Sequence, residues 1–291
     1  MEYKLENENL IVLASTYGAE LHSIKEKADN TEYLWNGDEK YWKYHAPVLF
    51  PIVGKVNGGK YKVEGKEYEL PQHGLARVRE FEVVYKSETT IVFQLNYDEK
   101  TLEVYPYKFT LRIGYTLFEN GIETSYEVIN MDQKEIYFSI GAHPAFLCPI
   151  VKGESFNDYY FKFSEEENCQ RMLLNKDGNL TDKKGEGLNN SAVIKLNQEL
   201  FKDDALIFDN LSSTEISLLS NKSNKGITMD FSGFPYLGLW SKPSGAPFVC
   251  IEPWYGHADY EDFSGEFKEK EGVQRLAVGE SFKASYTVTI K

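Results

Sequence analysis

Three short segments of the chain each place one titratable side chain beside residues that restrict the backbone. They are residues 70–77 with His73, 140–146 with His143, and 248–254 with Glu252. His143 and Glu252 each directly precede a proline, which favours an extended backbone at the preceding position. Side chains held in this way could project into a concavity at defined angles. An acid and a base placed there can move protons without a cofactor.

The surroundings of Glu252 are strongly apolar in sequence, since Phe248, Ile251 and Trp254 lie close by. A carboxyl group held against such side chains is partly desolvated, and desolvation raises its pKa toward values that suit a general base. For each position taken alone, the alternatives are a histidine that serves only packing and a glutamate that pairs with an arginine.

Aromatic side chains indicate what the site could bind. The four tryptophans Trp35, Trp42, Trp240 and Trp254 could offer flat apolar faces to the C–H side of a pyranose ring, and Trp240 stands at an irregular strand end. For any one of them, packing in the core is the alternative.

Alternating hydrophobicity predicts the elements that must carry these residues. Every second residue of 108–117 is apolar, Asn120-Gly121 signals a hairpin, and 122–128 alternates again. The further predicted strands are 81–85, 90–95, 136–140, 192–196, 215–219, 248–251 and 285–290. One short helix is expected within 263–274, and the polar stretch 175–191 is expected to be a surface excursion.

Many short strands with almost no helix predict an all-β fold, a β-sandwich or a related large antiparallel architecture. The chain has 291 residues, including 20 Tyr and 18 Phe, which suit pleated and half-buried surfaces. No internal repeat or linker is evident, and we expect one domain over residues 1–291.

Charge excludes several classes of partner. The 45 acidic and 32 basic residues give a net charge of -13, and such a field repels nucleic acids and anionic membranes. One run of basic residues contrasts with this negative net charge. We interpret the run as a solvated strand face in preference to an anion site. The run comprises Lys55, Lys60, Lys62, Lys66, Arg77 and Arg79.

The expected location is cytoplasmic. The first residues show no signal-peptide pattern, and no apolar run approaches the roughly 20 residues of a membrane span. The three cysteines, Cys148, Cys169 and Cys250, are too few and too scattered for a disulfide framework. Cys148 and Cys250 have apolar neighbours and are expected to be buried, reduced thiols.

In combination these motifs resemble the aldose 1-epimerase (galactose mutarotase-like) superfamily, and within it the LacX-like branch. The resemblance spans essentially the whole chain. It rests on the order and spacing of residues 18–21, 51–54, 72–77, 141–146, 202–206 and 250–254. It implies a supersandwich of antiparallel strands with a sugar pocket on its concave face.

The resemblance also implies roles for single residues. Glu252 matches the glutamate that takes the proton from the anomeric hydroxyl, and His143 matches the acid that protonates the ring oxygen. His73 matches a second histidine that hydrogen-bonds the sugar. Asp204 matches an aspartate that binds a sugar hydroxyl, with Asp203 as the neighbouring alternative.

Further binding contacts are expected from Lys55, Arg77 and Trp240. Lys55 stands where many members carry an arginine, and it keeps the charge but lacks the planar fork. The implied activity is interconversion of the α and β anomers of a free aldohexose, with no cofactor and no metal ion.

Four alternatives remain open. They are a hexose-6-phosphate mutarotase, a non-catalytic carbohydrate-binding protein, a glycoside hydrolase with Glu252 and Asp204 as its two carboxyl groups, and a metal site formed by His73, His143 and Glu252.

Overall fold

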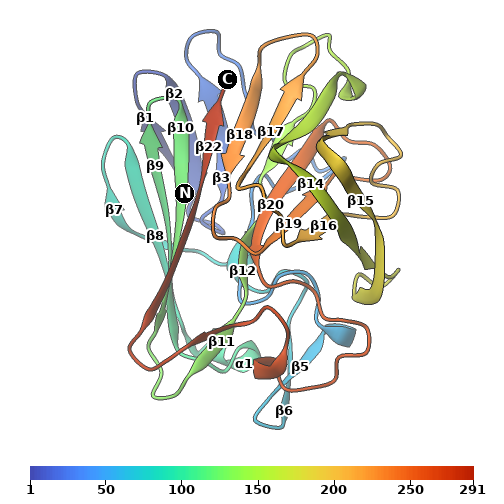
Figure 1. Ribbon diagram of the computed structural model, residues 1–291. Coiled ribbons are helices and arrows are strands. Elements are labelled where there is room, and N and C mark those ends of the chain that lie inside the picture. Colours follow the sequence, from blue (N-terminus) through green and yellow to red (C-terminus); the bar gives the residue numbers. More distant parts are fainter.

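The computed structural model describes residues 1–291, and its regular structure is almost entirely antiparallel β (Figure 1). The strands of the first half are β1 (Glu2–Glu6), β2 (Leu10–Ser15), β3 (Leu21–Glu26), β4 (Val48–Leu49), β5 (Lys60–Val63), β6 (Lys66–Glu69), β7 (Glu82–Lys86), β8 (Thr90–Asn96), β9 (Phe109–Phe118), β10 (Gly121–Asn130), β11 (Ile136–Phe138), β12 (Ile140–Ala142) and β13 (Ala145–Leu147). Those of the second half are β14 (Tyr159–Leu174), β15 (Leu180–Lys195), β16 (Leu206–Asp209), β17 (Glu215–Ser220), β18 (Gly226–Asp230), β19 (Tyr236–Trp240), β20 (Phe248–Tyr255), β21 (Gln274–Leu276) and β22 (Ser281–Ile290).

Most strands belong to one 15-stranded sheet. Its neighbours follow the order β4-β12-β20-β19-β16-β14-β17-β18-β22-β10-β9-β8-β7, with β13 also paired to β20 and β15 to β14. Figure 1 shows β7 to β10 and β22 on one side of the molecule and β14 to β20 on the other. Smaller sheets are formed by β1-β2-β3, by β5-β6 and by β11-β21. The predicted all-β, antiparallel supersandwich is confirmed.

The alternation in the sequence does identify the buried face of β9. Phe109, Leu111, Ile113, Tyr115 and Leu117 are all buried there. The predicted hairpin joins β9 to β10 with Gly121 paired to Phe118, so the turn consists of residues 119–120. The predicted strand 192–196 proves to be only the last part of the much longer β15, which begins at Leu180. The other predicted strands are found within a few residues of their expected bounds, with two exceptions.

The first exception is the predicted strand 136–140, which is divided at Ser139. Its first part, β11, pairs with β21, and its second part, β12, pairs with β4 and β20 in the main sheet. The second is the predicted strand 248–251, which continues to Tyr255 as β20. Glu252 therefore lies inside a strand and not directly after one, and the predicted end of this strand at residue 251 is wrong.

The interpretation of 175–191 as a surface excursion is also wrong. Most of it belongs to β15, which pairs with β14 in a hairpin of two 16-residue strands (Figure 1). Much of β15 is exposed on both faces, so polar residues occupy positions that an ordinary half-buried strand would fill with apolar ones. This is why its sequence does not alternate.

The helix expected within 263–274 is reduced to a 3-10 turn over Phe267–Glu269, followed by β21. Further 3-10 turns span Asn57–Gly59, Ala76–Val78 and Phe156–Asp158. The one α-helix, α1 (Glu99–Val104), was not predicted. Asp98 caps it by accepting from the backbone N–H of Thr101, in a capping box. At six residues it is far too short to cross a membrane, so the molecule has no membrane-spanning helix.

The main hydrophobic cluster contains 63 buried residues and runs from Leu5 to Ile290. Two smaller clusters lie beside the candidate site. One includes Trp254 and Ile207, and the other includes Phe248 and Cys250. The strands that carry Glu252 and its neighbours are therefore packed on both sides, which gives the site a rigid floor.

Candidate active site

A cavity of about 460 Å³ opens over β19, β20 and the β14–β15 turn. Its size suits a small ligand. All seven residues that the sequence analysis assigned to catalysis or binding line this cavity. They are Lys55, His73, Arg77, His143, Asp204, Trp240 and Glu252.

Strand β20 brings Glu252 to the floor of the cavity. It pairs with β19 on one side, where Gly238 stands opposite Glu252, and with β12 and β13 on the other. Side chains alternate along a strand, so Cys250, Glu252 and Trp254 share one face. Glu252 is 1% exposed although it is ionisable.

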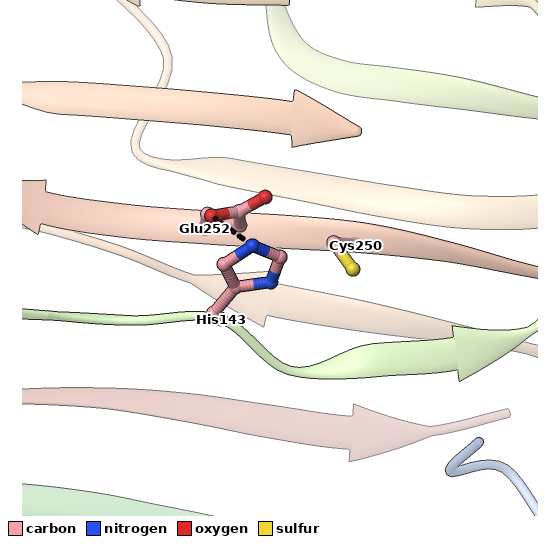
Figure 2. A group of neighbouring side chains, drawn as sticks. All are labelled: His143, Cys250 and Glu252. Carbon is pink, nitrogen blue, oxygen red and sulfur yellow. Dashed lines mark ion pairs between the residues drawn. The ribbon is translucent and has the colours of Figure 1, made fainter. Parts of the chain in front are cut away.

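His143 reaches Glu252 from the connection between β12 and β13. Its Nε2 lies 3.2 Å from Oε2 of Glu252 (Figure 2), and the two side chains are 9% and 2% exposed. The imidazole packs between Trp42 and Trp240, with ring centroids 4.8 and 5.7 Å away. Its Nδ1 is buried and has no hydrogen-bond partner. The structure therefore brings together the acid and the base that were predicted from two separate segments.

Burial acts on the two groups in opposite senses. It raises the pKa of Glu252 well above the usual carboxyl range, and the nearby Asp204 adds to this effect. Burial also lowers the pKa of His143 to about 3. Both shifts favour the uncharged forms, so the free pair holds one proton, on Glu252, over a wide pH range.

His73 lies in a loop that is joined to the segment after β4. Its N–H donates to Gly54, its carbonyl accepts from Phe50, and its Nδ1 accepts from the N–H of Gly54 at 3.2 Å. Because Nδ1 is an acceptor, Nε2 carries the proton and is the nitrogen available to donate to a ligand. Burial lowers the pKa of His73 well below its usual range, which keeps this neutral tautomer.

The backbone at His73 is in the left-handed region, with φ of 65°. For a residue other than glycine this costs on the order of 1–3 kcal/mol, and such strain concentrates at functional sites. The ring meets His143 edge to face, with centroids 5.4 Å apart.

Of the two neighbouring aspartates, Asp204 lines the cavity and Asp203 does not. Asp204 also has a left-handed backbone, with φ of 76°, and its Oδ1 accepts from the N–H of Ala205. It precedes β16, whose Ile207 lines the same cavity.

Four cationic side chains line the cavity, two more than were predicted. Lys55 donates to the carbonyl of Asp177 at 2.9 Å, and Arg77 donates to that of Gln72 at 2.7 Å. Lys242 donates to the carbonyl of Tyr41 at 2.7 Å, and Lys176 has no such contact. Lys176 and Lys242 were missed because nothing in their local sequence marks them. The fold brings them to the cavity from a hairpin turn and from the segment after β19.

The basic run seen in the sequence is divided in space. Lys55 and Arg77 line the cavity, whereas Lys60 and Lys66 are exposed on the β5–β6 hairpin. Lys60 pairs there with Glu67 and Glu69. The interpretation as a solvated face is thus correct for the middle of the run only. Arg77 forms no ion pair and instead stacks on Tyr44, 4.9 Å from the ring centroid.

Three of the four tryptophans, Trp42, Trp240 and Trp254, line the cavity, together with Tyr41. Trp35 does not. Its Nε1 donates to the carbonyl of Trp42 at 2.8 Å, so it positions the loop that carries Trp42. Glu20 holds the end of the same loop by accepting from the N–H groups of His45 and Ala46.

A metal-ligating set also exists at the site, but it differs from the one considered in the sequence. Ligand atoms of His143, Cys250 and Glu252 lie within 4.8 Å of one another. His73, which was the expected third ligand, accepts from Gly54 through one nitrogen and stands outside this set.

All three cysteines are free, and Cys148 and Cys250 are buried as expected.

Residues 1–275 match the family model described as aldose 1-epimerase. The chain belongs to the aldose 1-epimerase family. It is 36% identical over 298 residues to the chromosomal Protein LacX of Lactococcus lactis subsp. lactis, an alignment that covers 100% of this chain and 99% of the relative. The LacX-like resemblance is confirmed.

Solved structures agree with this assignment to the aldose 1-epimerases. A galactose mutarotase related enzyme from Lactobacillus acidophilus has a TM-score of 0.95 and 36% identity, covering 100% of this chain and 97% of its own. A galactose mutarotase-like protein from Lactobacillus casei ATCC 334 has a TM-score of 0.94 and 31% identity, with 100% of both chains covered. The chain is thus an isomerase of the aldose 1-epimerase type with a mutarotase-like function on sugars.

Proposed function

We propose that this aldose 1-epimerase interconverts the α and β anomers of a free aldohexose by acid–base ring opening. One observation carries the proposal. Nε2 of His143 lies 3.2 Å from Oε2 of Glu252 on the floor of a cavity of about 460 Å³. An acid and a base so close together can serve the ring oxygen and the anomeric hydroxyl, which are bonded to the same carbon.

The reaction begins when the proton of Glu252 passes to Nε2 of His143, 3.2 Å away, which leaves a Glu252 carboxylate and a His143 imidazolium. In the first half of the reaction, Glu252 then removes the proton from the anomeric hydroxyl. The electron pair forms the C1=O bond, the bond from C1 to the ring oxygen breaks, and that oxygen takes a proton from His143. The open-chain aldehyde is the product of this step. At its end Glu252 is protonated and His143 is neutral.

In the second half, the aldehyde turns about the C1–C2 bond and the ring closes on the opposite face. The hydroxyl that attacks C1 returns its proton to His143, and Glu252 returns its proton to the new anomeric oxygen. The opened state has the neutral pair that burial favours. Ring opening thus restores the uncharged pair that the free enzyme holds, and after closure the proton of His143 returns to Glu252 to complete the cycle.

The remaining cavity residues would hold and orient the sugar. His73 would donate from Nε2 to an oxygen near the ring, since its Nδ1 is occupied by Gly54. Asp204 would accept from a sugar hydroxyl, and Lys55 and Arg77 would donate to hydroxyl oxygens. Trp240, which flanks His143, would offer its face to the C–H side of the ring.

A second candidate is a sugar that carries an acidic substituent such as a phosphate. The observation in its favour is the set of four cations around the cavity, Lys55, Arg77, Lys176 and Lys242. Three of them already donate to backbone carbonyl groups, and Lys176 is the one that does not. We therefore place the neutral aldohexose first.

Polarimetry tests the proposal. Freshly dissolved α-D-glucose and α-D-galactose should reach anomeric equilibrium faster with catalytic amounts of the protein than in buffer alone. Equilibration at the buffer-only rate for a panel of aldoses and their phosphates would reject the proposal. Binding of the same sugars without acceleration would then favour a non-catalytic carbohydrate-binding protein.

A further inference from the structure

Cys250 has no part in the proposed reaction, yet it lies next to the acid–base pair. It precedes Glu252 by two positions on β20, so both side chains point to the same face of the sheet. Figure 2 shows its sulfur beside the His143 ring, with Glu252 on the adjacent side of the ring. Cys250 is 0% exposed.

The spacing of the three side chains suits a tetrahedral metal ion. The ligand atoms of His143, Cys250 and Glu252 lie within 4.8 Å of one another. With zinc bonds of about 2.0–2.2 Å to nitrogen and oxygen, the 3.2 Å between Nε2 and Oε2 corresponds to an angle of about 100° at the ion, close to tetrahedral. The third ligand is the sulfur of Cys250, which must move toward the ion to reach a zinc–sulfur bond length of about 2.3 Å.

The nitrogen of His143 that would ligate the ion is Nε2, which faces Glu252, and the other ring nitrogen is unpaired. This nitrogen, Nδ1, is buried without a hydrogen-bond partner, although buried polar atoms are nearly always paired. Because Nδ1 forms no hydrogen bond, the imidazole is not tied to another protein group and is free to adjust to an ion bound at Nε2.

The donor set selects the kind of ion. A thiol, an imidazole and a carboxyl group together suit Zn²⁺, whereas Mg²⁺ and Ca²⁺ prefer oxygen ligands alone. Since His143 and Glu252 line the cavity, the fourth coordination position would face it. Water would fill that position in the absence of other ligands.

We propose that Zn²⁺ binds to His143, Cys250 and Glu252 within the sugar pocket and blocks the enzyme. The ion displaces the proton that His143 and Glu252 share and the proton of the Cys250 thiol, and both protons leave to solvent. With the pair ligated, neither group can exchange a proton with the sugar. The binding site stands independently of the reaction, and only the inhibition rests on the proposed function.

Cobalt is a spectroscopic probe for such a site, because a cobalt–thiolate bond produces a charge-transfer band in the near ultraviolet. We expect Co²⁺ added to the reduced, full-length protein to produce this band at one equivalent, and Zn²⁺ to abolish it. Cys250→Ser should remove the band. Cys169→Ser is the matched control because Cys169 is the most accessible thiol and the obvious place for adventitious binding.

Loss of the band in Cys250→Ser with retention in Cys169→Ser supports the site, and the reverse overturns it. Absence of any band in the unmodified protein also overturns it. Should Cys250→Ser fail to fold, zinc X-ray absorption of the unmodified protein must show one sulfur ligand at about 2.3 Å. A zinc shell of nitrogen and oxygen alone would reject the proposal.

Inhibition is measured by mutarotation rates under a series of free Zn²⁺ concentrations. We expect competition with the sugar, and an inhibition constant at least tenfold weaker in Cys250→Ser than in Cys169→Ser. Dialysis against a chelator should leave the rate unchanged, since the reaction uses no metal. A protein that binds Co²⁺ through Cys250 but never accelerates mutarotation would contradict the proposed function and leave the metal site in place.

Discussion

Glu252 and His143 are ionisable side chains that are almost completely buried. The contact between them explains how they could still exchange protons. Alone, a buried carboxyl group at 1% exposure would simply stay protonated. With a histidine nitrogen at 3.2 Å, its proton has a nearby acceptor. In the proposed reaction the pair passes one proton between its members as a sugar arrives and leaves.

Removing either member should stop most of the catalysis. We expect Glu252→Gln and His143→Asn each to lower the mutarotation rate by about 10² to 10⁴, the usual cost of losing one proton-transfer group. Both changes keep the hydrogen-bonding shape of the side chain, so the melting temperature should not fall greatly. Polarimetry and thermal unfolding of the same samples provide the measurement. A fully active Glu252→Gln protein would refute the assignment of the base.

The pKa shifts predict an unusual pH profile. The pair loses its base only when His143 also becomes protonated, near its pKa of about 3. It loses its acid when the shared proton departs, at the raised pKa of Glu252. We therefore expect kcat/KM to stay level as the pH falls through the ordinary pKa values of 6.5 for histidine and 4.5 for glutamate. A steep decline between those two values would show that the pair titrates as two ordinary groups.

At the scale of elements, the loop of His73 depends on the glycine that follows it. Gly74 has φ of 73°, and a Cβ atom there would lie 2.3 Å from the carbonyl oxygen of Phe50. That oxygen accepts from the N–H groups of Leu75 and Ala76, so it cannot move away without loss of both bonds. The loop and the segment after β4 are therefore locked together at this point.

Gly74→Ala should lower the free energy of unfolding by roughly 2–4 kcal/mol and weaken sugar binding by displacing His73. Gly58→Ala is the matched control, since it has φ of 61° but nothing within 4 Å of the added atom. Its cost should be limited to about 1–2 kcal/mol of backbone strain. Denaturant unfolding and KM values of the two variants test this. Equal costs would mean that the contact with Phe50 is unimportant.

The elements also show how far a sequence can predict this fold and site. Strands with one buried face, such as β9 and β10, follow the alternation rule and were predicted correctly. The β14–β15 hairpin was not, because exposure of both faces removes the alternation, and α1 is too short for a helical period. Residues before proline identified His143 and Glu252, but their 3.2 Å contact depends on the pairing of β12 with β20.

The whole molecule has a net charge of -13, yet four cations surround its cavity. Long-range repulsion discourages an approaching anion, and a local positive patch attracts it. Lys55, Arg77 and Lys242 each donate one hydrogen bond to a backbone carbonyl oxygen, which fixes the positions of these side chains around the cavity. The two effects oppose each other, and the neutral sugar remains the first proposed substrate.

We accordingly expect a higher kcat/KM for glucose than for glucose 6-phosphate. The value for glucose should be insensitive to ionic strength, because an uncharged ligand experiences no screened force. Measurements with both sugars at two salt concentrations decide the matter. A preference of tenfold or more for the phosphate, shrinking as salt is added, would make the cations a phosphate site and replace the first candidate substrate by the second.

Isolation of the acid–base pair from water also bears on the relation between the enzyme and its buffer. In solution, the opening of a sugar ring is hastened by any dissolved acid or base that happens to collide with it. In the proposed reaction the proton given up at opening is recovered at closure, so each turnover leaves the pair in its starting protonation state. The catalysed rate should then be the same in dilute and in concentrated buffer of one pH, although the background rate climbs.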